Sequence, residues 1–204
     1  MKPRILKKMK KMKSKTILLL LSLFLTFSLV SCNNSRFSDK ELADVAAELI
    51  ESSKEINEIF FGEGLPVDES TSQIKDGEEV TGGNYCRVTS DCPYRTKDEV
   101  KEAAEKVFSD EYLSQVYESA FEGSDDIRPR YGTDSTGALT RDITSAKKQT
   151  DEWTEWNKST IEIKSASSSR AVFSVEGTFR GKTEREVMQM VYTAQGWRLD
   201  SPTY

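Results

Sequence analysis

The sequence predicts an α+β domain in which N-terminal helices pack on a C-terminal antiparallel β-sheet meander. Two observations carry this prediction. Apolar residues recur at spacings of three, four or seven in residues 39–121, as on one face of a helix. In residues 155–200 they alternate with polar residues, as in strands with one buried face. The change of period places the helices before the strands.

The first 31 residues are predicted to be a signal peptide. Residues 1–16 carry eight basic residues and no acidic one, and an apolar and hydroxyl stretch follows over residues 17–30. At 1.5 Å per residue this stretch spans roughly 21 Å, which is shorter than the roughly 30 Å hydrocarbon core of a bilayer. A resident membrane helix is therefore disfavoured. Met1, Met9 and Met12 all precede the stretch, so the start codon stays open.

The apolar stretch ends in Leu29-Val30-Ser31-Cys32, which resembles the bacterial lipobox. Cys32 is the expected lipidation site, and several acyl chains such as palmitate hold a protein stably on a bilayer. We therefore expect a lipoprotein on the extracytoplasmic face of the cell membrane. Residues 32–38 would form a tether, and residues 39–204 a single domain.

Cleavage before Cys32 would make the protein strongly acidic. The eight basic residues leave with the signal peptide, so the formal net charge falls from −5 to −13. Such a surface repels the phosphates of nucleic acids, which are not expected partners. It suits either basic partners or simple solubility.

Three helices are predicted from capping signals followed by apolar periodicity. Ser38 and Glu41 form a capping box that opens a helix over residues 39–60. Thr96 and Glu99 form a second box, and Ser109 caps a third helix directly afterwards. We expect their apolar faces to be core.

The regions between and after these helices contain loops and strands. Residues 64–84 and 123–150 have few apolar residues and read as long loops around a short strand at 85–88. Antiparallel strands are expected in the last third, with a Gln195-Gly196 turn before a final strand over 197–200. Their alternating apolar residues are Ile161, Ile163, Ala171, Phe173, Val175, Phe179, Met188, Met190 and Tyr192.

Cys86 and Cys92 are the cysteines that remain after lipidation. An even pair in a non-reducing compartment is predicted to form a disulfide. Free thiols are the alternative, because many exported proteins avoid disulfides.

The residue composition disfavours enzymatic chemistry. The chain has no histidine, so Ser-His-Asp triads, Cys-His dyads and histidine metal sites are excluded, and no cofactor is expected. Carboxylate pairs suited to glycoside hydrolysis exist at Asp125-Asp126, Asp151-Glu152 and Glu184 with Glu186. With 34 acidic residues such pairs arise by chance, so we expect a protein that is not an enzyme.

Two further groups of residues have a functional and a structural interpretation. An acidic stretch could hold calcium but lacks the ligand spacing of an EF-hand, so a solvated loop is favoured and no metal site is expected. Its acids are Asp68, Glu69, Asp76, Glu78 and Glu79. Trp153 and Trp156 could form a recognition platform, but rings that cover the sheet edge are favoured.

Several short motifs in this order resemble a family of secreted proteins. They are the segment 60–68 (FFGEGLPVD) after a long helix, Tyr85, the capped helix from Thr96, the segment 107–112 (VFSDEY), and the closing GWRLD at 196–200. Tyr131 and Leu139 lie between them. This arrangement is similar to the IseA-type inhibitors of peptidoglycan DL-endopeptidases.

The resemblance implies a protein that blocks the catalytic groove of an NlpC/P60-type cell-wall endopeptidase. This chain differs from the secreted members in its lipobox, which would confine it near the membrane. The loops 64–84 and 123–150 are the expected contact surface, because loops held by a rigid scaffold commonly carry binding. The alternative is a small-ligand or protein-binding lipoprotein with a cystatin-like or NTF2-like fold.

Overall fold

The computed structural model describes residues 36–72, 83–124, 128–145 and 154–204. These residues belong to one compact unit that begins at Ser35. The unit has the predicted α+β class, with its strands mostly C-terminal. Cys32 and the predicted signal peptide lie outside the described residues. In the described part of the chain, no helix is long and apolar enough to cross a membrane.

The longest element is the helix α2 (Asp39–Phe61). The predicted capping box is present: the Ser38 backbone N–H donates to Glu41 Oε2 at 2.8 Å, and the Glu41 N–H donates to Ser38 Oγ at 3.3 Å. These bonds satisfy donors that a helix start leaves unpaired. The prediction of this helix is confirmed, and it extends one residue further than expected.

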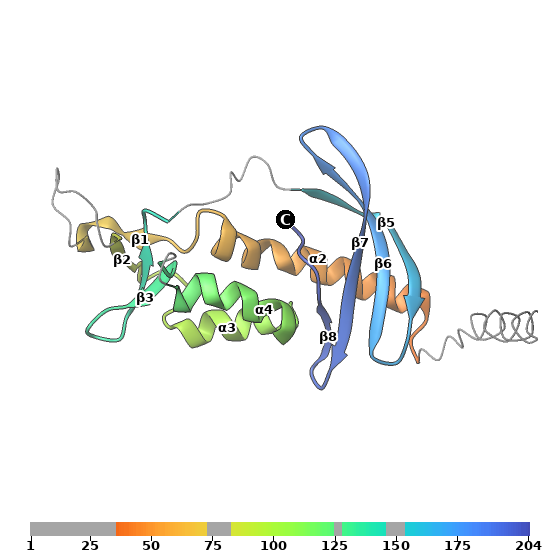
Figure 1. Cartoon of the computed structure of the whole chain (residues 1–204), viewed down its shortest axis with the longest axis horizontal. Helices are drawn as coiled ribbons and strands as arrows, with labels where there is room; N and C mark the ends of the chain where they lie inside the picture. The colour runs from red at the N-terminus through yellow and green to blue at the C-terminus, as the bar shows by residue number, and fades with distance from the viewer. Residues whose placement is uncertain (1–35, 73–82, 125–127, 146–153) are drawn as a thin grey trace, which may run out of the picture. The chain divides into compact units, whose positions relative to one another are not determined.

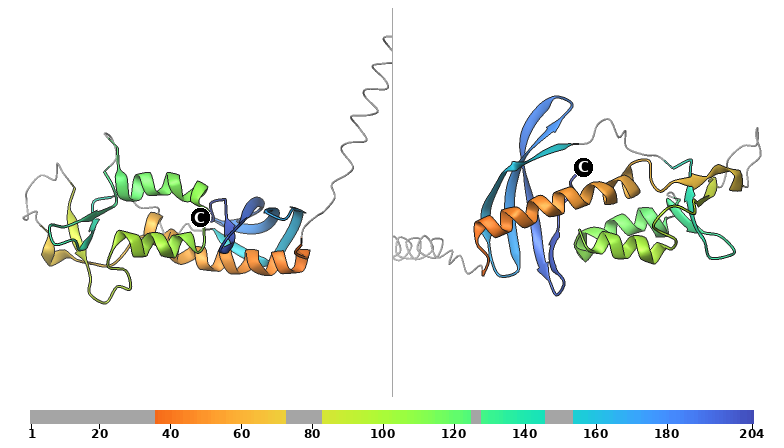
Figure 2. Two further views of the ribbon diagram at one scale, coloured as in Figure 1. Left: turned by 90° about the horizontal axis from the view of Figure 1, so that it is seen from below. Right: turned by 180° about the vertical axis from the view of Figure 1, so that it is seen from behind.

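The last third forms the predicted antiparallel meander, which we call sheet B. Its strands are β5 (Glu155–Ala166), β6 (Arg170–Phe179), β7 (Lys182–Thr193) and β8 (Gly196–Leu199), in that order across the sheet. Figures 1 and 2 show α2 lying across one face of this sheet. Alternate residues of β6 and of the second half of β7 are buried in the core, as the period of two requires; they are Ala171, Phe173, Val175, Met188 and Met190.

The two capped helices are also present. They are α3 (Lys97–Glu105) and α4 (Asp110–Tyr117), and a π-helix η2 (Glu118–Glu122) continues α4. The junction between α3 and α4 pairs with the last strand: Leu199 N–H donates to the Val107 carbonyl and Ser109 N–H to the Leu199 carbonyl, both at 2.8 Å. The helices are thereby fixed to the edge of sheet B.

A second antiparallel sheet, sheet A, corrects the prediction of two long loops. Its strands are β1 (Val67–Asp68), β2 (Tyr85–Val88), β4 (Leu139–Asp142) and β3 (Tyr131–Thr133), in that order across the sheet. A 3₁₀ turn, η1 (Glu69–Thr71), follows β1. Only the strand at 85–88 was predicted. Strands of two to four residues are too short to show alternation, and their pairing is long-range.

The space between α2, α3, α4 and sheet B is filled by one hydrophobic core. Its fully buried side chains include Leu42, Ile50, Phe108, Leu113, Phe173, Val175, Met190 and Leu199. The C-terminal tail closes this core: Thr203 Oγ1 donates to Ser53 Oγ at 2.7 Å and accepts from Asn57 Nδ2 at 2.9 Å. The Thr203 carbonyl accepts from Trp156 Nε1 at 2.8 Å, so the tail joins α2 to β5.

An ion pair also joins α2 to β5 and makes stability depend on pH. Glu51 accepts from Lys158 at 2.6 Å and from Lys54 at 2.8 Å, and these bonds lower the pKa of Glu51 from 4.5 to about 2. A depressed carboxylate pKa stabilises the folded state above the unfolded pKa. The stabilisation is lost as the pH falls from about 4.5 to about 2.

We therefore predict that Glu51→Gln lowers the free energy of unfolding at pH 6 but not near pH 2. The measurement is urea unfolding of wild type and variant across this pH range. Glu48→Gln is the matched control, because Glu48 is exposed on the same helix and has no ion pair among the described residues. A difference between wild type and Glu51→Gln that is the same at both pH values would contradict the prediction.

Candidate protein-binding site on sheet A

The two regions expected to form the contact surface meet on sheet A. Residues 64–72 supply β1 and η1, residues 128–145 supply β3 and β4, and β2 lies between them. A hollow of about 480 Å³ opens here. Its lining is mostly polar and consists of Thr71, Gly83, Asn84, Tyr85, Arg87, Pro129, Gly132, Thr133, Asp134, Ser135 and Thr140.

The rim of the hollow is built on the turn between β3 and β4. Asp134 Oδ1 accepts from the Thr136 and Ala138 N–H groups at 2.8 and 3.0 Å, and from Thr136 Oγ1 at 2.6 Å. Gly137 completes the turn with a φ of 86°, which a side chain would disfavour. The hydroxyls of Thr133 and Ser135 on this turn are exposed at the mouth of the hollow.

An ion pair crosses the hollow and fixes this turn to β2. Arg87 Nε donates to Asp134 Oδ2 at 2.9 Å, and Arg87 Nη2 donates to the same oxygen. The hydrogen bonds from Thr136 and Arg87 hold the pKa of Asp134 well below its usual range. The carboxylate is therefore charged, and its charge is compensated by Arg87 within the site.

Tyr85 lines the hollow, and the buried Asp142 lies behind its lining residue Asn84, whose backbone N–H donates to Asp142 Oδ1 at 2.9 Å. Tyr85 donates its hydroxyl to the Pro129 carbonyl at 2.5 Å, and burial raises the pKa of Tyr85. Its ring lies against Gly132, where a Cβ would come within 3.3 Å of it. Burial alone would raise the pKa of Asp142, but hydrogen bonds from Thr144, Asn84 and Arg128 outweigh it and lower that pKa. These hydrogen bonds hold Tyr85 to the segment before β3 and Asp142 to the segment before β2.

Sheet A is held against the C-terminal end of α2 by two neighbouring side chains. Tyr131 is fully buried; its hydroxyl donates to the Ile59 carbonyl at 2.8 Å and accepts from the Leu65 N–H at 3.0 Å. Arg130, also buried, donates from Nε to the Ile59 carbonyl at 3.2 Å and from Nη2 to the Gly62 carbonyl at 2.5 Å. The hollow is thus attached to the rest of the unit through buried hydrogen bonds.

The expected disulfide is absent from the structure, where Cys86 and Cys92 are both buried, free thiols. Cys92 packs in the hydrophobic core, whereas Cys86 lies outside that core with its Sγ 4.0 Å from Asn84 Oδ1. The two thiols therefore occupy different surroundings. Burial raises the pKa of the Cys86 thiol, so this group is protonated and a poor nucleophile at neutral pH.

The other candidate residues do not come together with this hollow. Glu184 and Glu186 lie exposed on β7, while the pairs at 125–126 and 151–152 are outside the described residues. Asp68 caps η1 by accepting from the Ser70 N–H at 3.0 Å, and the acids at 76–79 are again outside. Within the described ranges, no group of three or more acidic or cysteine side chains could hold a metal ion.

Of the two tryptophans considered for a recognition platform, Trp156 lies in the described residues and Trp153 lies outside them. The Trp156 ring lies against Gly177 of the neighbouring strand β6, where a Cβ would come within 2.5 Å of it. This matches the interpretation of a ring that covers the sheet, not an exposed platform.

The hollow contains residues that the sequence did not single out, chiefly Arg87, Asp134 and Thr140. An Asp-x-Thr-Gly turn signal was present at 134–137 and could have indicated the rim. Nothing local could have indicated its pairing with Arg87. No protein-family model and no curated protein matches the chain.

The anchor of sheet A can be tested by Tyr131→Phe. Loss of the hydroxyl leaves the Leu65 N–H buried without its partner, so the free energy of unfolding should fall by roughly 1–3 kcal/mol. Urea denaturation with an unchanged m-value is the measurement. The control is Tyr192→Phe, which removes a hydroxyl without a hydrogen bond among the described residues and should stay within roughly 0.5 kcal/mol of wild type. Equal effects of the two variants would refute the anchoring role.

Proposed function

We propose that this chain is a membrane-tethered extracytoplasmic lipoprotein that binds and inhibits a cell-wall DL-endopeptidase of the NlpC/P60 type. The lipobox at Cys32 supports the tether, and the motif order from residue 60 to residue 200 supports the inhibitor family. The observation that carries the proposal is that the described parts of both expected contact regions meet around one hollow.

The surface of the hollow suits inhibition by steric blocking. A protein that blocks a groove gains affinity when its contact surface is already ordered before binding, because less entropy is lost. Here the β3–β4 turn is fixed by the Asp134 side chain and by its ion pair with Arg87. The exposed hydroxyls of Thr133 and Ser135 remain available for hydrogen bonds to a partner.

The position of the hollow along the chain is consistent with a tethered inhibitor. The lipid would be attached just before the N-terminal end of α2, whereas sheet A contacts the C-terminal end. A helix of 23 residues is roughly 34 Å long at 1.5 Å per residue. Such a spacer would present the hollow to a partner in the wall rather than to the lipid headgroups.

The alternative of a small-ligand protein receives less support. It requires an apolar cavity between the helix and the curved sheet. In the described residues this space is filled by side chains that are fully buried, such as Ile50 of α2 and Phe173 of β6. A binding surface therefore fits the molecule better than an internal pocket.

The test is an inhibition assay with the full-length lipoprotein in detergent micelles. A purified NlpC/P60 DL-endopeptidase digests peptidoglycan, and digestion is followed by turbidity and by release of stem-peptide fragments. We expect slowing at concentrations of lipoprotein close to that of the enzyme. No slowing at a large excess over several such enzymes would refute the proposal.

The location of the contact surface is tested separately with a double variant at the rim. Thr133→Lys with Ser135→Lys places two bulky charges at the mouth and should weaken inhibition at least about tenfold, which is about 1.4 kcal/mol. Gln115→Lys with Ser168→Lys adds the same charge at exposed positions away from sheet A and should have no effect. Equal inhibition by both double variants would place the contact surface elsewhere.

A further inference from the structure

Strand β7 has an open edge along its first half. β8 pairs only with residues 190–193 of β7, and the tail then leaves after Asp200 N–H donates to the Gln189 carbonyl at 2.9 Å. Residues 182–187 are all exposed, and no described strand pairs with them on that side. This stretch lies on the part of the hairpin that extends beyond β8 in Figure 1.

The backbone groups on this edge can be identified from the register. In antiparallel strands, alternate residues direct both backbone groups to the same neighbouring strand. Gln189 directs its groups away from β6, since its N–H donates to Ser201 Oγ at 3.0 Å and its carbonyl accepts from Asp200. By alternation, Thr183, Arg185 and Val187 present their N–H and C=O groups to the open edge.

The open edge lacks the bulges that usually protect such edges. The outer strand β5 at the opposite side of sheet B has register shifts between Asn157 and Glu162 and between Ile163 and Ser165. β6 pairs with β7 without a register shift, from the pair Arg170 and Val191 to the pair Phe179 and Lys182. The geometry needed to accept another strand is therefore intact on β7 and disrupted on β5.

A groove of about 380 Å³ runs beneath the open edge. Its apolar lining comes from Trp156, Phe179, Met188, Pro202 and Tyr204. Phe179 is 42% exposed and Val187 on the edge itself is 64% exposed, and these are the large apolar side chains most exposed in the described residues. A strand added to β7 would cover Val187.

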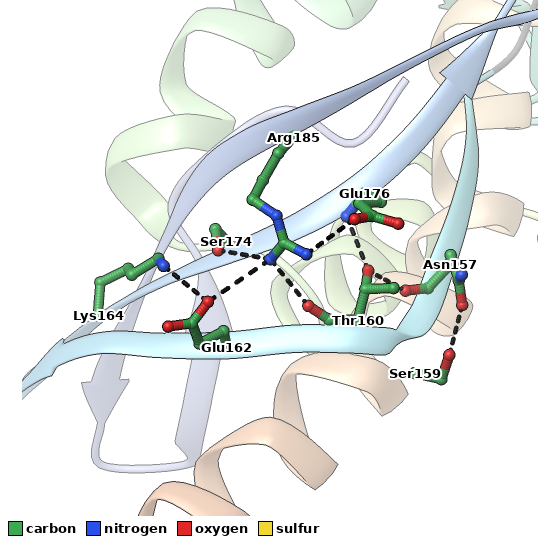
Figure 3. A network of polar contacts seen from close by, with 8 residues as sticks. All are labelled: Asn157, Ser159, Thr160, Glu162, Lys164, Ser174, Glu176 and Arg185. Carbon is green, nitrogen blue, oxygen red and sulfur yellow. Dashed lines mark hydrogen bonds and ion pairs between the residues drawn. The ribbon is translucent and has the colours of Figure 1, made fainter.

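The groove side of the edge has a net negative charge, because its charged lining residues are Lys182, Glu184 and Glu186. Glu184 and Glu186 share the face of β7 that carries Met188, and neither has an ion-pair partner among the described residues. The neighbouring cation, Arg185, points to the other face. Figure 3 shows its guanidinium bonded to the Thr160 carbonyl at 3.1 Å, to Ser174 Oγ at 3.0 Å and to Glu176 at 2.9 Å. It therefore does not neutralise the two carboxylates.

We infer that the open edge of β7 accepts an extended peptide segment of a partner protein that carries basic residues at alternate positions. Its backbone would pair with Thr183, Arg185 and Val187, and its lysine or arginine side chains would lie opposite Glu184 and Glu186. A second copy of this chain fits less well in the central register, because antiparallel pairing about Arg185 would place Glu184 of each copy opposite Glu186 of the other. This site is separate from the hollow on sheet A and goes beyond the proposed inhibitory function.

The experiment uses the full-length lipoprotein in detergent micelles and two short synthetic peptides. One alternates lysine with valine, and the other alternates glutamate with valine. Isothermal titration calorimetry should detect binding of the lysine peptide alone. Hydrogen exchange should show slower exchange of the Arg185 and Val187 amides in the complex, which a purely electrostatic surface contact would not produce.

Matched variants separate the backbone pairing from the charge. Val187→Pro removes an N–H on the open edge without removing a bond to β6, and should abolish binding; Val187→Thr keeps the N–H and should bind as wild type does. Glu184→Gln with Glu186→Gln should weaken binding roughly tenfold. Glu48→Gln with Glu102→Gln removes the same charge from exposed helix positions and should leave affinity unchanged.

Three outcomes would overturn the inference. They are the absence of lysine-peptide binding, equal binding by the proline and threonine variants, and sedimentation as a dimer that Val187→Pro dissociates. None of these bears on inhibition through sheet A, so the failure of one proposal can be told from the failure of the other.

Discussion

The carbonyl groups at the C-terminal end of α2 are the constraint on which the arrangement of the molecule depends. A helix end leaves its last carbonyls without partners inside the helix, and in a buried setting they must be satisfied by other groups. Here the partners are Arg130 and Tyr131, which come from far along the chain. The bonds that complete the helix therefore also place β3, and with it the whole of sheet A.

The same helix organises the other sheet by a different interaction. Its N-terminal part lies across sheet B through apolar side chains, and the polar residues Ser53 and Asn57 receive the C-terminal tail through Thr203. α2 therefore contacts sheet B along an apolar face and sheet A through hydrogen bonds at its end, as Figure 2 allows the reader to follow. Between α2 and sheet B the described side chains form one buried hydrophobic core.

The two surfaces differ in whether their charged side chains are paired. In the hollow on sheet A, Arg87 and Asp134 neutralise each other, and neutral hydroxyls are left at the rim. On β7, Arg185 is bonded to Glu176 and Ser174 on the outer face, so it does not pair with Glu184 or Glu186 on the groove face. The first surface suits hydrogen bonding to a shaped partner, and the second suits an extended basic segment.

The sequence by itself determined the helices and the meander of sheet B. Capping boxes at Ser38 and Thr96 act within one turn of helix, and the alternation in residues 171–190 repeats often enough to be recognised. Only the tertiary structure decided sheet A, the different surroundings of Cys86 and Cys92, and the composition of the hollow. Each of these depends on partners distant in the chain, such as Arg87 with Asp134 or Tyr131 with Ile59, and such pairing leaves no local pattern.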